Sequence, residues 1–498
     1  MIANVAIDSS VHARPLGVSK LRGRSLRLSA SLSVRLVTMA YAVVFGAAGV
    51  LDYVGFRSAG YDLGNNVQAI WNTAHGRLLE TTAVYGQQFP RLGWHVDPLL
   101  VLFAPVWLVW SSPVILLVLQ AAVVSAGALP VYWLARKHLR SERAAAFFAL
   151  AYLLYPATQW NALDPNLGFH PVSLALPLLL YALWWLDEER WVRFGAVALV
   201  AAASNEQIPL IVGCFGLWYG VTRRRFVVGA ALFGAGLAVT AVDFLYVVPH
   251  FSPSGSNPFA YRYAAVGGTT AGILKTVLLH PLRVADVMLT GHKLTYLALL
   301  FVPLLGLCLR APLLLLAAVP PLAINLLSSS HDQSLVSSHY AAAIAAVLFG
   351  ATIFGAARST DPVRLSCIVL PAVGLTALLS PFWTALPVAR YAVTATPLVQ
   401  AERHAVRLIP RGVPVSASNI LSSHLSDRRR ILLFPVIRDA EWIAVDTADT
   451  EGASSFRAVV QRLRERGSFA TVYESNGVVV MRRIHQSGLA ATRAADEA

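Results

Sequence analysis

Charged residues are scarce in this chain of 498 residues: Asp, Glu, Lys and Arg make up 13% of it, whereas 56% of the residues are hydrophobic. Soluble globular domains carry about 25% charged residues, so the composition excludes an ordinary soluble protein. Long apolar runs recur between residues 36 and 382, and runs of this kind cross membranes as helices. The sequence therefore predicts a mainly α, polytopic helical membrane protein.

Cysteine and the common catalytic motifs are also scarce. The three cysteines, Cys214, Cys308 and Cys367, all lie within apolar runs and lack the spacing of a disulfide framework or a metal site. The sequence contains no P-loop, dinucleotide-binding fingerprint, zinc-protease motif or nucleophile elbow. Nucleotide hydrolysis and serine hydrolysis are therefore unsupported.

Acidic residues are outnumbered, because 26 Asp and Glu stand against 40 Lys and Arg, which gives a net charge of +14. In a soluble protein this excess would suggest a nucleic-acid partner. Here many basic residues lie in the N-terminal arm and in short loops between apolar runs, where they set the orientation of the spans. We expect a multi-pass protein of the plasma (inner) membrane with a cytoplasmic N-terminus and no nucleic-acid partner.

Four regions follow from these patterns. Residues 1–33 are expected to form a cytoplasmic basic arm, and residues 34–382 a membrane domain with long external loops at 57–98 and 250–292. The first apolar run has the length of a retained anchor, although a cleaved signal peptide is the alternative. About eleven spans are expected, at Leu36–Phe56, Val114–Leu134, Ala144–Tyr155, Val172–Leu186, Phe194–Ala203, Ile208–Val221, Phe226–Val248, Leu294–Leu309, Leu313–Leu327, Ala341–Phe354 and Leu365–Leu379.

The third and fourth regions follow the last span. Residues 383–484 are expected to form a small extracytoplasmic α/β domain without disulfides, and residues 485–498 a disordered tail. Within the domain the alternation of apolar and polar residues predicts strands at Pro414–Ala417, Arg430–Phe434, Trp442–Asp446, Phe469–Tyr473 and Gly477–Met481. Helices are predicted at Ser418–Leu425 and Phe456–Arg466.

The first long loop is polar and yet amphipathic. Leu63, Val67 and Ile70 recur at helical spacing between polar residues, as in a helix lying along a membrane surface. Asp62 stands at the head of this helix, which predicts an active-site lid instead of a simple connector. Leu99–Trp110 is too short to span and is predicted to dip into the outer leaflet, and a second surface helix is expected at Ile273–Leu289.

Several motifs follow one another along the chain: YDLGNNVQAIWNTAHG, HVDPLLVLFAPVWLV, AYLLYPATQ, FHP, a late His339-Tyr340 pair and VSASNILSSHLSDRRRILLFP. As a set they resemble the polytopic membrane-protein family catalogued as domain of unknown function 2079. That family's plan is similar to the GT-C superfamily of membrane glycosyltransferases. The resemblance implies a polyprenyl-phosphate sugar as donor and a catalytic acidic residue in the first external loop, where Asp62 matches. Many such enzymes carry two adjacent carboxylates there, whereas Leu63 and Gly64 follow Asp62, which leaves metal dependence open.

The candidate residues of the first loop each have two interpretations. Asp62 is expected to act as the catalytic base that deprotonates an acceptor hydroxyl, although capping of the following helix is the alternative. His95 and Asp97 are expected to contact substrate, or to join Asp62 in holding a divalent metal ion such as Mg²⁺ or Mn²⁺. An ordinary polar turn is the alternative for this pair.

Further candidates lie at the external ends of the spans, where ionisable groups usually pair or face a wet cavity. His170 and Glu206 are expected to line the substrate cavity, with Asp164 nearby; a plain interfacial position is the alternative. His339 and Arg262 are expected to bind the donor, because arginine suits bidentate contact with phosphate. A hydrated loop is the alternative for His339.

These observations predict a membrane glycosyltransferase that moves a sugar from a polyprenyl-phosphate donor to an extracytoplasmic glycan, lipid or protein. A lipid-linked sugar transporter or flippase, and a non-catalytic envelope scaffold, are the alternatives. A transporter needs polar residues along a path through the membrane. The charges of this chain gather instead at the external ends of spans, which favours the enzyme.

Overall fold

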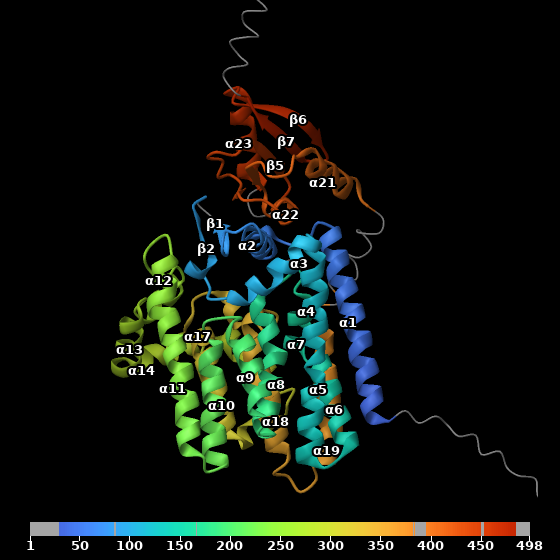
Figure 1. Cartoon of the computed structure of the whole chain (residues 1–498), viewed down its shortest axis with the longest axis vertical. Coiled ribbons are helices and arrows are strands. Elements are labelled where there is room, and N and C mark those ends of the chain that lie inside the picture. The colour runs from blue at the N-terminus through green and yellow to red at the C-terminus, as the bar shows by residue number, and fades with distance from the viewer. Residues whose placement is uncertain are drawn as a thin grey trace, which may run out of the picture.

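The structure is a computed structural model that describes residues 29–83, 86–165, 167–381, 383, 395–449 and 453–484, without the side chains of 453–455. Most of the expected basic arm and the whole expected tail lie outside these residues. The described chain has two parts, a tall helix bundle and a small sheet-containing domain at one end of it (Figure 1). We call that end of the bundle the domain end and the opposite one the far end.

Apolar helices make up the bundle. Among the described residues, five helical stretches are long and apolar enough to cross a membrane, or six if one bent pair is counted as a span, and several shorter apolar helices accompany them. Each of the eleven expected runs contains a helix, so the predicted fold class is confirmed. The bundle helices are α1 (Ala30–Val54), α4 (Val114–Ala126), α5 (Ala128–Leu139), α6 (Glu142–Leu154), α7 (Pro156–Leu163), α8 (Ala175–Asp187), α9 (Trp191–Ala202), α10 (Ile208–Thr222), α11 (Phe226–Val242), α12 (Val248–Phe251), α15 (Gly291–Phe301), α16 (Pro312–Leu315), α17 (Val319–Leu327), α18 (Ala342–Ala356) and α19 (Pro362–Thr376).

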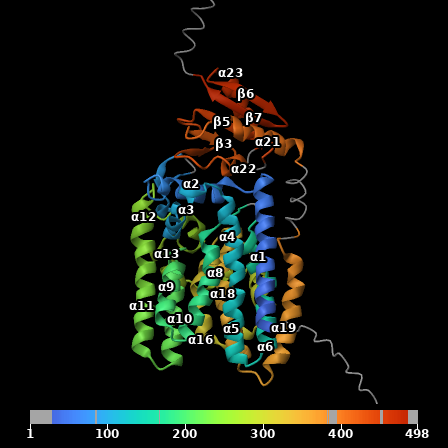
Figure 2. The same cartoon turned by 45° about the vertical axis from the view of Figure 1, so that its right-hand side comes forward.

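Burial follows the position of each helix in the bundle. Helix α18 is apolar all round and Phe354 is its one residue that is not buried, as expected for a central helix. Helices α11 and α19 lie at opposite edges of the bundle (Figure 2), and only 17% of the most apolar window of each is buried inside the protein. Their outward faces are therefore available to lipid.

The predicted second surface helix is two helices, α13 (Thr270–Leu279) and α14 (Pro281–Met288). The prediction was wrong on continuity because Pro281 lacks the N–H that a continuous helix needs and clashes with the preceding turn. Helix α14 then meets α15 at an angle of 71°. The chain therefore turns sharply between α14 and the bundle helix α15.

The C-terminal domain has a five-stranded sheet in the order β4-β3-β5-β7-β6, with β3 parallel to β4 and β5 and the remaining pairs antiparallel. Side chains alternate between its faces: Trp442 and Ala444 pack with α21 and α22, whereas Ile443 and Val445 pack with α23. The five predicted strands and two predicted helices are present, with small shifts in their bounds. The elements are α21 (Pro397–Leu408), β3 (Val415–Ala417), α22 (Asn419–Ser423), β4 (Ile431–Leu433), β5 (Trp442–Asp446), α23 (Ala453–Glu465), β6 (Phe469–Ser475) and β7 (Val478–Arg483).

The first long loop lies between the bundle and this domain (Figure 1). It contains a π-helical turn η1 (Gly60–Gly64), α2 (Asn65–Ala74), a hairpin of β1 (Glu80–Thr82) and β2 (Gln88–Pro90), and then η2 (Arg91–Gly93), η3 (Pro98–Phe103) and α3 (Ala104–Val109). The helix expected along the membrane surface is present as α2, but its polar face is covered by protein, because Asn66 and Gln68 are fully buried. Gln68 donates to the carbonyl of Arg429 at 2.8 Å, so the C-terminal domain covers the polar face of the helix.

Candidate functional site

Asp62 lies in η1, the π-helical turn between α1 and α2. Turns of this kind are rare and are frequently found at functional sites. The backbone of the turn is fixed from the C-terminal domain, since the N–H of Tyr61 donates to Oδ1 of Asn419 at 2.9 Å. Asn419 begins α22, so this short helix contacts the turn that carries Asp62.

Glycine allows α22 to approach so closely. A Cβ built on Gly60 would lie 1.5 Å from Oγ of Ser422, and one on Gly64 would lie 2.7 Å from Oγ of Ser426. A side chain larger than hydrogen at Gly60 does not fit without moving α22, and one at Gly64 requires the side chain of Ser426 to move. The docking of the C-terminal domain therefore helps to set the position of Asp62.

His170 bridges two carboxylates. Its Nε2 lies 3.2 Å from Oδ1 of Asp62, and its Nδ1 lies 3.0 Å from Oδ2 of Asp164. The side chains of His170 and Asp164 are 8% and 3% exposed, whereas that of Asp62 is 26% exposed. Asp62 is thus the accessible member of this group, and the two others lie buried behind it.

The charges of the three residues depend on one another. Burial alone would lower the pKa of His170, but the nearby carboxylates of Asp62 and Asp164 outweigh it and raise that pKa to about 9. Burial would raise the pKa of Asp62, but the charge and hydrogen bond of His170 hold it below its ordinary value. Burial raises the pKa of Asp164 despite its own hydrogen bond with Nδ1 of His170. An ionised Asp62 therefore faces the accessible side, beside a protonated imidazole.

His339 lies against this group from another part of the chain. Its ring stacks on that of His170 with 3.7 Å between the centroids, and its Nδ1 lies 4.0 Å from Oδ2 of Asp164. The hydroxyl of the next residue, Tyr340, accepts a hydrogen bond from Nη1 of Arg262 at 3.0 Å. The turn η10 (His339–Ala341) thus connects Arg262 with the His170 group.

A cavity opens beside the group at the domain end of the bundle. Two ion pairs brace it: Nε of Arg91 lies 2.8 Å from Oδ2 of Asp97, and Nδ1 of His95 lies 3.2 Å from Oε1 of Glu206. Glu206 lies in the turn between α9 and α10, so this pair ties the first loop to the bundle. The polar residues of the cavity wall are Arg91, His95, Asp97, His170, Ser204, Asn205, Gln207, Asn325, His339 and Tyr340.

The predicted site residues come together at this end of the bundle. His95, Asp97, His170 and His339 line the cavity, and Asp62 contacts His170. Glu206 contacts His95 and Arg262 contacts Tyr340, each one contact behind the cavity wall. The sequence alone indicated no role for Asn419 and did not place Arg91 in the cavity wall. For Asn419 the available signal was its position in the motif SNILSSHLSD.

The predicted metal ligands Asp62, His95 and Asp97 are arranged differently from a metal centre. His95 and Asp97 already pair with Glu206 and Arg91. Mutually close ligand atoms are found instead, within the described residues, at Asp164, His170 and His339. The first set stays a prediction without a matching cluster.

Comparison with known proteins gives a family and a fold. The family described as "Predicted membrane protein (DUF2079)" matches residues 53–480. No curated protein matches the chain.

Solved structures resemble it at low sequence identity. ArnT from Cupriavidus metallidurans bound to undecaprenyl phosphate has a TM-score of 0.50 at 12% identity, over 90% of this chain and 98% of that one. Its apo state has a TM-score of 0.48 at 13% identity with the same coverage. The Archaeoglobus fulgidus oligosaccharyltransferase complex with Zn and sulfate has a TM-score of 0.42 at 16% identity, over 88% of this chain and 73% of that one. The chain therefore shares the fold of ArnT.

Proposed function

Since the chain belongs to the DUF2079 family of predicted membrane proteins and has a GT-C fold, we propose that it is a membrane glycosyltransferase. It transfers a sugar from a polyprenyl-phosphate donor to an extracytoplasmic glycan, lipid or protein. The observation that carries the proposal is the part-exposed Asp62, whose pKa is held below its ordinary value and whose Oδ1 lies 3.2 Å from Nε2 of His170, a buried residue of the cavity wall.

Asp62 is the base in this proposal. The acceptor hydroxyl oxygen attacks the anomeric carbon of the donor sugar, and the bond from that carbon to the phosphate oxygen breaks. The phosphate leaves with the electron pair, and the hydroxyl proton passes to Asp62. His170 holds the carboxylate in place, and Asp164 in turn holds His170 through its Nδ1. A positioned carboxylate of this kind contributes about 10²–10⁴-fold to such a step.

The donor needs cationic contacts for its phosphate and a lipid face for its tail. Arg91 lines the cavity, and Arg262 lies behind it on Tyr340. Arginine binds phosphate through two parallel N–H bonds, which suits both positions. ArnT, whose fold this chain shares, was solved with undecaprenyl phosphate, and this supports a polyprenyl-phosphate donor.

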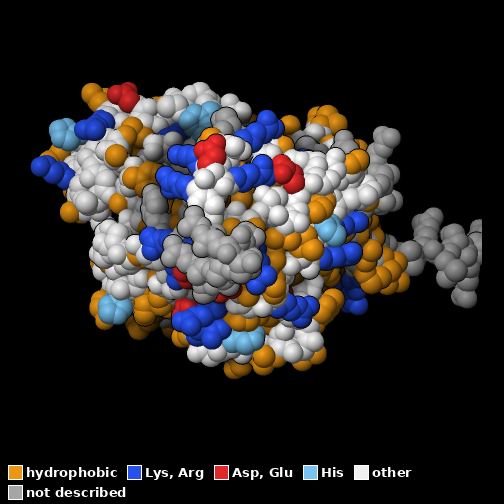
Figure 3. All heavy atoms as spheres, turned by 90° about the horizontal axis from the view of Figure 1, so that it is seen from above, with side chains coloured by type: hydrophobic (Ala, Val, Ile, Leu, Met, Phe, Trp, Pro, Cys, Tyr) orange, Lys and Arg blue, Asp and Glu red, His pale blue; other side chains and the backbone are white. Residues whose placement is uncertain are grey.

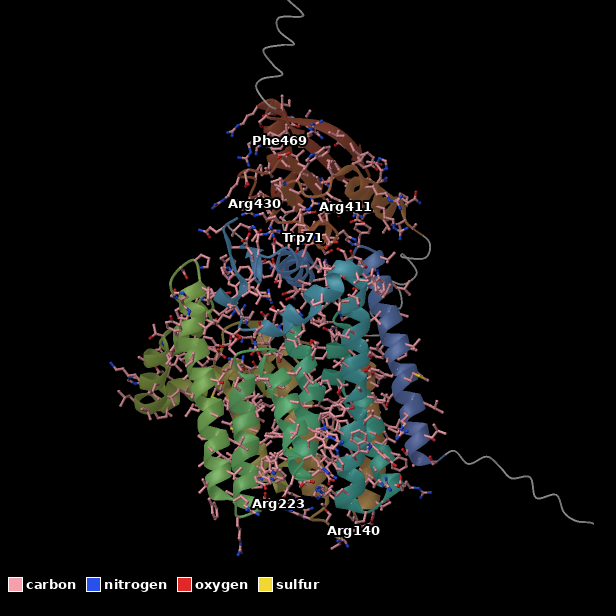
Figure 4. The ribbon with its side chains drawn as sticks, viewed as in Figure 1. Trp71, Arg140, Arg223, Arg411, Arg430 and Phe469 are labelled. Carbon is pink, nitrogen blue, oxygen red and sulfur yellow. The ribbon has the colours of Figure 1, made fainter. Side chains whose placement is uncertain are left out.

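The sidedness of the reaction follows from the loop charges. Short basic loops gather at the far end, with Arg140 and Arg223 among them (Figure 4). Positively charged short loops stay in the cytoplasm, which supports an extracytoplasmic site and C-terminal domain in a plasma-membrane protein.

The test is the substitution Asp62→Asn. Purified protein in lipid nanodiscs is given a panel of radiolabelled polyprenyl-phosphate sugars together with envelope acceptors, and transfer is measured. The wild-type chain should transfer one of these sugars, and Asp62→Asn should lower the rate by about 10²-fold or more while the protein still folds. Wild-type turnover in this variant would remove Asp62 from the chemistry.

The matched control is Asp332→Asn. Asp332 is an exposed carboxylate in η9 (His331–Ser334), outside the cavity wall and the His170 group. Its substitution removes the same charge without touching the proposed base, so transfer should stay at the wild-type rate.

A further inference from the structure

A cavity of about 590 Å³ lies where the C-terminal domain meets the chain segment between α1 and η1. Residues of that segment, of α21, of α22 and of the chain at and after the end of β5 line it. Within the described part of the chain, it shares no lining residue with the cavity beside His170. Small-molecule sites are usually cavities of about 300–1,000 Å³. This space is therefore a candidate ligand site separate from the proposed catalytic one.

The path of the chain through the sheet explains why a cavity forms here. The parallel strands β3 and β5 are neighbours, but the chain leaves β3 toward β4 and leaves β5 toward β6, at the opposite edge of the sheet. The connecting helices α22 and α23 pack on opposite faces of the sheet (Figure 2). Where two connections diverge in this way, a crevice opens outside the carboxyl ends of the strands, and ligands commonly bind in it. Asn419, two residues after β3, and Asp446, the last residue of β5, both line the cavity.

Glu402 supplies a second, independent observation. It lies on α21, is 2% exposed and lines the cavity. Among the described residues, no group donates a hydrogen bond to its carboxyl or forms an ion pair with it. A buried carboxyl without a partner is costly, and a bound donor would offset that cost. The carboxyl of Glu402 is therefore positioned to bind a ligand that donates hydrogen bonds.

The balance of charge in the cavity selects the kind of ligand. Among the described residues, three carboxyls line it, those of Glu402, Asp446 and Asp449, against one guanidinium, that of the exposed Arg57. An excess of acidic groups creates a negative potential, which disfavours phosphates and other anions and favours a cation. The ligand is therefore expected to carry positive charge.

We propose that this cavity binds a small organic cation with an alkylammonium group. The ammonium donates hydrogen bonds to the carboxyl of Glu402, and its charge offsets that of the neighbouring acidic groups. The apolar part of the wall, with Phe56, Leu398 and Ile420, receives the methylene groups of the ligand. A bare metal ion would leave most of the cavity empty and this apolar wall without a contact. The location and the ligand of the site do not depend on the proposed function.

The experiment compares matched four-carbon probes on the full-length protein in a neutral detergent. Calorimetry measures the binding of putrescine, butanediol and succinate, which carry positive, neutral and negative end groups. We expect putrescine to bind at least tenfold more tightly than butanediol, and succinate not to bind. A free diamine and a lysine side chain present the same alkylammonium group. Nα-acetyl-lysine amide is therefore the fourth probe, and the tighter of the two amines identifies the source as a free amine or a peptide side chain.

Glu402→Gln keeps the size of the side chain and removes its charge. It should weaken putrescine binding by about tenfold or more, because the charge-assisted hydrogen bond is lost. Glu465→Gln is the matched control, since Glu465 is an exposed carboxylate at the end of α23 in the same domain, outside the cavity wall. Its substitution should leave putrescine binding unchanged.

Three results would each overturn the site: no binding of either amine at millimolar concentration, equal binding of putrescine and butanediol, or an unchanged putrescine affinity in Glu402→Gln. The comparison of putrescine with butanediol uses the wild-type protein, so it does not depend on the folding of a variant. None of these measurements uses the transfer reaction. Failure of the site therefore leaves the proposed function standing, and failure of Asp62→Asn to lower transfer leaves the site standing.

Discussion

Glu402 shows how a single residue couples the C-terminal domain to pH. It lies on α21, is 2% exposed, and lines a cavity together with Asp446 and Asp449. Burial, and then the negative charges of these two residues, raise the pKa of Glu402 to about 8 from an ordinary value of 4.5. The folded protein therefore keeps a proton on Glu402 at pH values where the unfolded chain has lost it.

The sign of the effect on stability follows from proton linkage. Between about pH 4.5 and 8 the folded state binds one more proton than the unfolded state at this residue, so the free energy of unfolding falls as pH rises. Glu402→Gln should remove this slope and raise the melting temperature at pH 8 relative to wild type. The corresponding gain in the free energy of unfolding is at most a few kcal/mol, at about 1.4 kcal/mol per pKa unit. Thermal unfolding at pH 5 and pH 8 measures it.

A carboxylate on the surface of the same domain serves as the control. Glu465 is exposed at the end of α23, and Glu465→Gln should leave the pH dependence unchanged. If Glu402→Gln melts like the wild type at both pH values, Glu402 is ionised in the folded protein and the inference from burial is wrong.

The sequence predicted the members of the candidate site better than it predicted the contacts between them. Asp62, His170 and His339 could be chosen because ionisable groups at the ends of spans are costly and usually functional. That His170 lies between Asp62 and Asp164 could not be predicted, since the helices α2 to α7 separate Asp62 from His170 along the chain and no local pattern sets their distance. The stacking of His339 depends likewise on the path of α18.

At the scale of secondary-structure elements, the apolar helices could be predicted from the sequence, whereas the points at which a helix breaks were harder to predict. Apolar runs alone locate the helices, because composition sets membrane crossing. The burial of α2 could not be predicted, since its exposed-looking polar face is covered by a domain more than 300 residues later, through the contact of Gln68 with Arg429. Amphipathicity indicates that a helix has two environments and does not identify the second one.

The contact between η1 and α22 gives a prediction at this scale. In Gly60→Ala the new Cβ would overlap Ser422 and would also lie 2.8 Å from the backbone oxygen of Asn419, so α22 must move. We expect the variant to lose about 1–3 kcal/mol of stability, as overpacked sites do, and to lose transfer activity because Asp62 shifts. Thermal unfolding and the transfer assay measure the two effects.

Gly195→Ala in α9 is the control for the added methyl group. No atom lies within 4 Å of a Cβ built there, so its stability and its activity should stay at or above wild type. A fully active and stable Gly60→Ala would show that the C-terminal domain does not hold the Asp62 turn.

At the scale of the whole molecule, charge is present at both ends but in different kinds of segment. The face seen from above, with the C-terminal domain toward the viewer, carries many basic side chains and few acidic ones (Figure 3), and the basic residues of this domain are all arginines. The far end carries its basic residues in short connections, such as Arg223 and Arg224 between α10 and α11. Only charges in short loops orient spans, whereas large domains cross the membrane largely regardless of charge. The basic face of the C-terminal domain is therefore compatible with an extracytoplasmic location of that domain.

Cysteine labelling tests this orientation and, with it, the side on which the cavity opens. Cys214 and Cys308 are buried and Cys367 is exposed, so Cys367→Ser gives a background without an accessible thiol among the described cysteines. In that background Arg411→Cys should react with a membrane-impermeant maleimide in intact cells, because Arg411 is exposed on the C-terminal domain (Figure 4). Arg224→Cys at the far end should react only after permeabilisation. The reverse pattern would place Asp62 on the cytoplasmic side, where an extracytoplasmic acceptor cannot reach it, and the proposed transfer reaction would fail with the orientation.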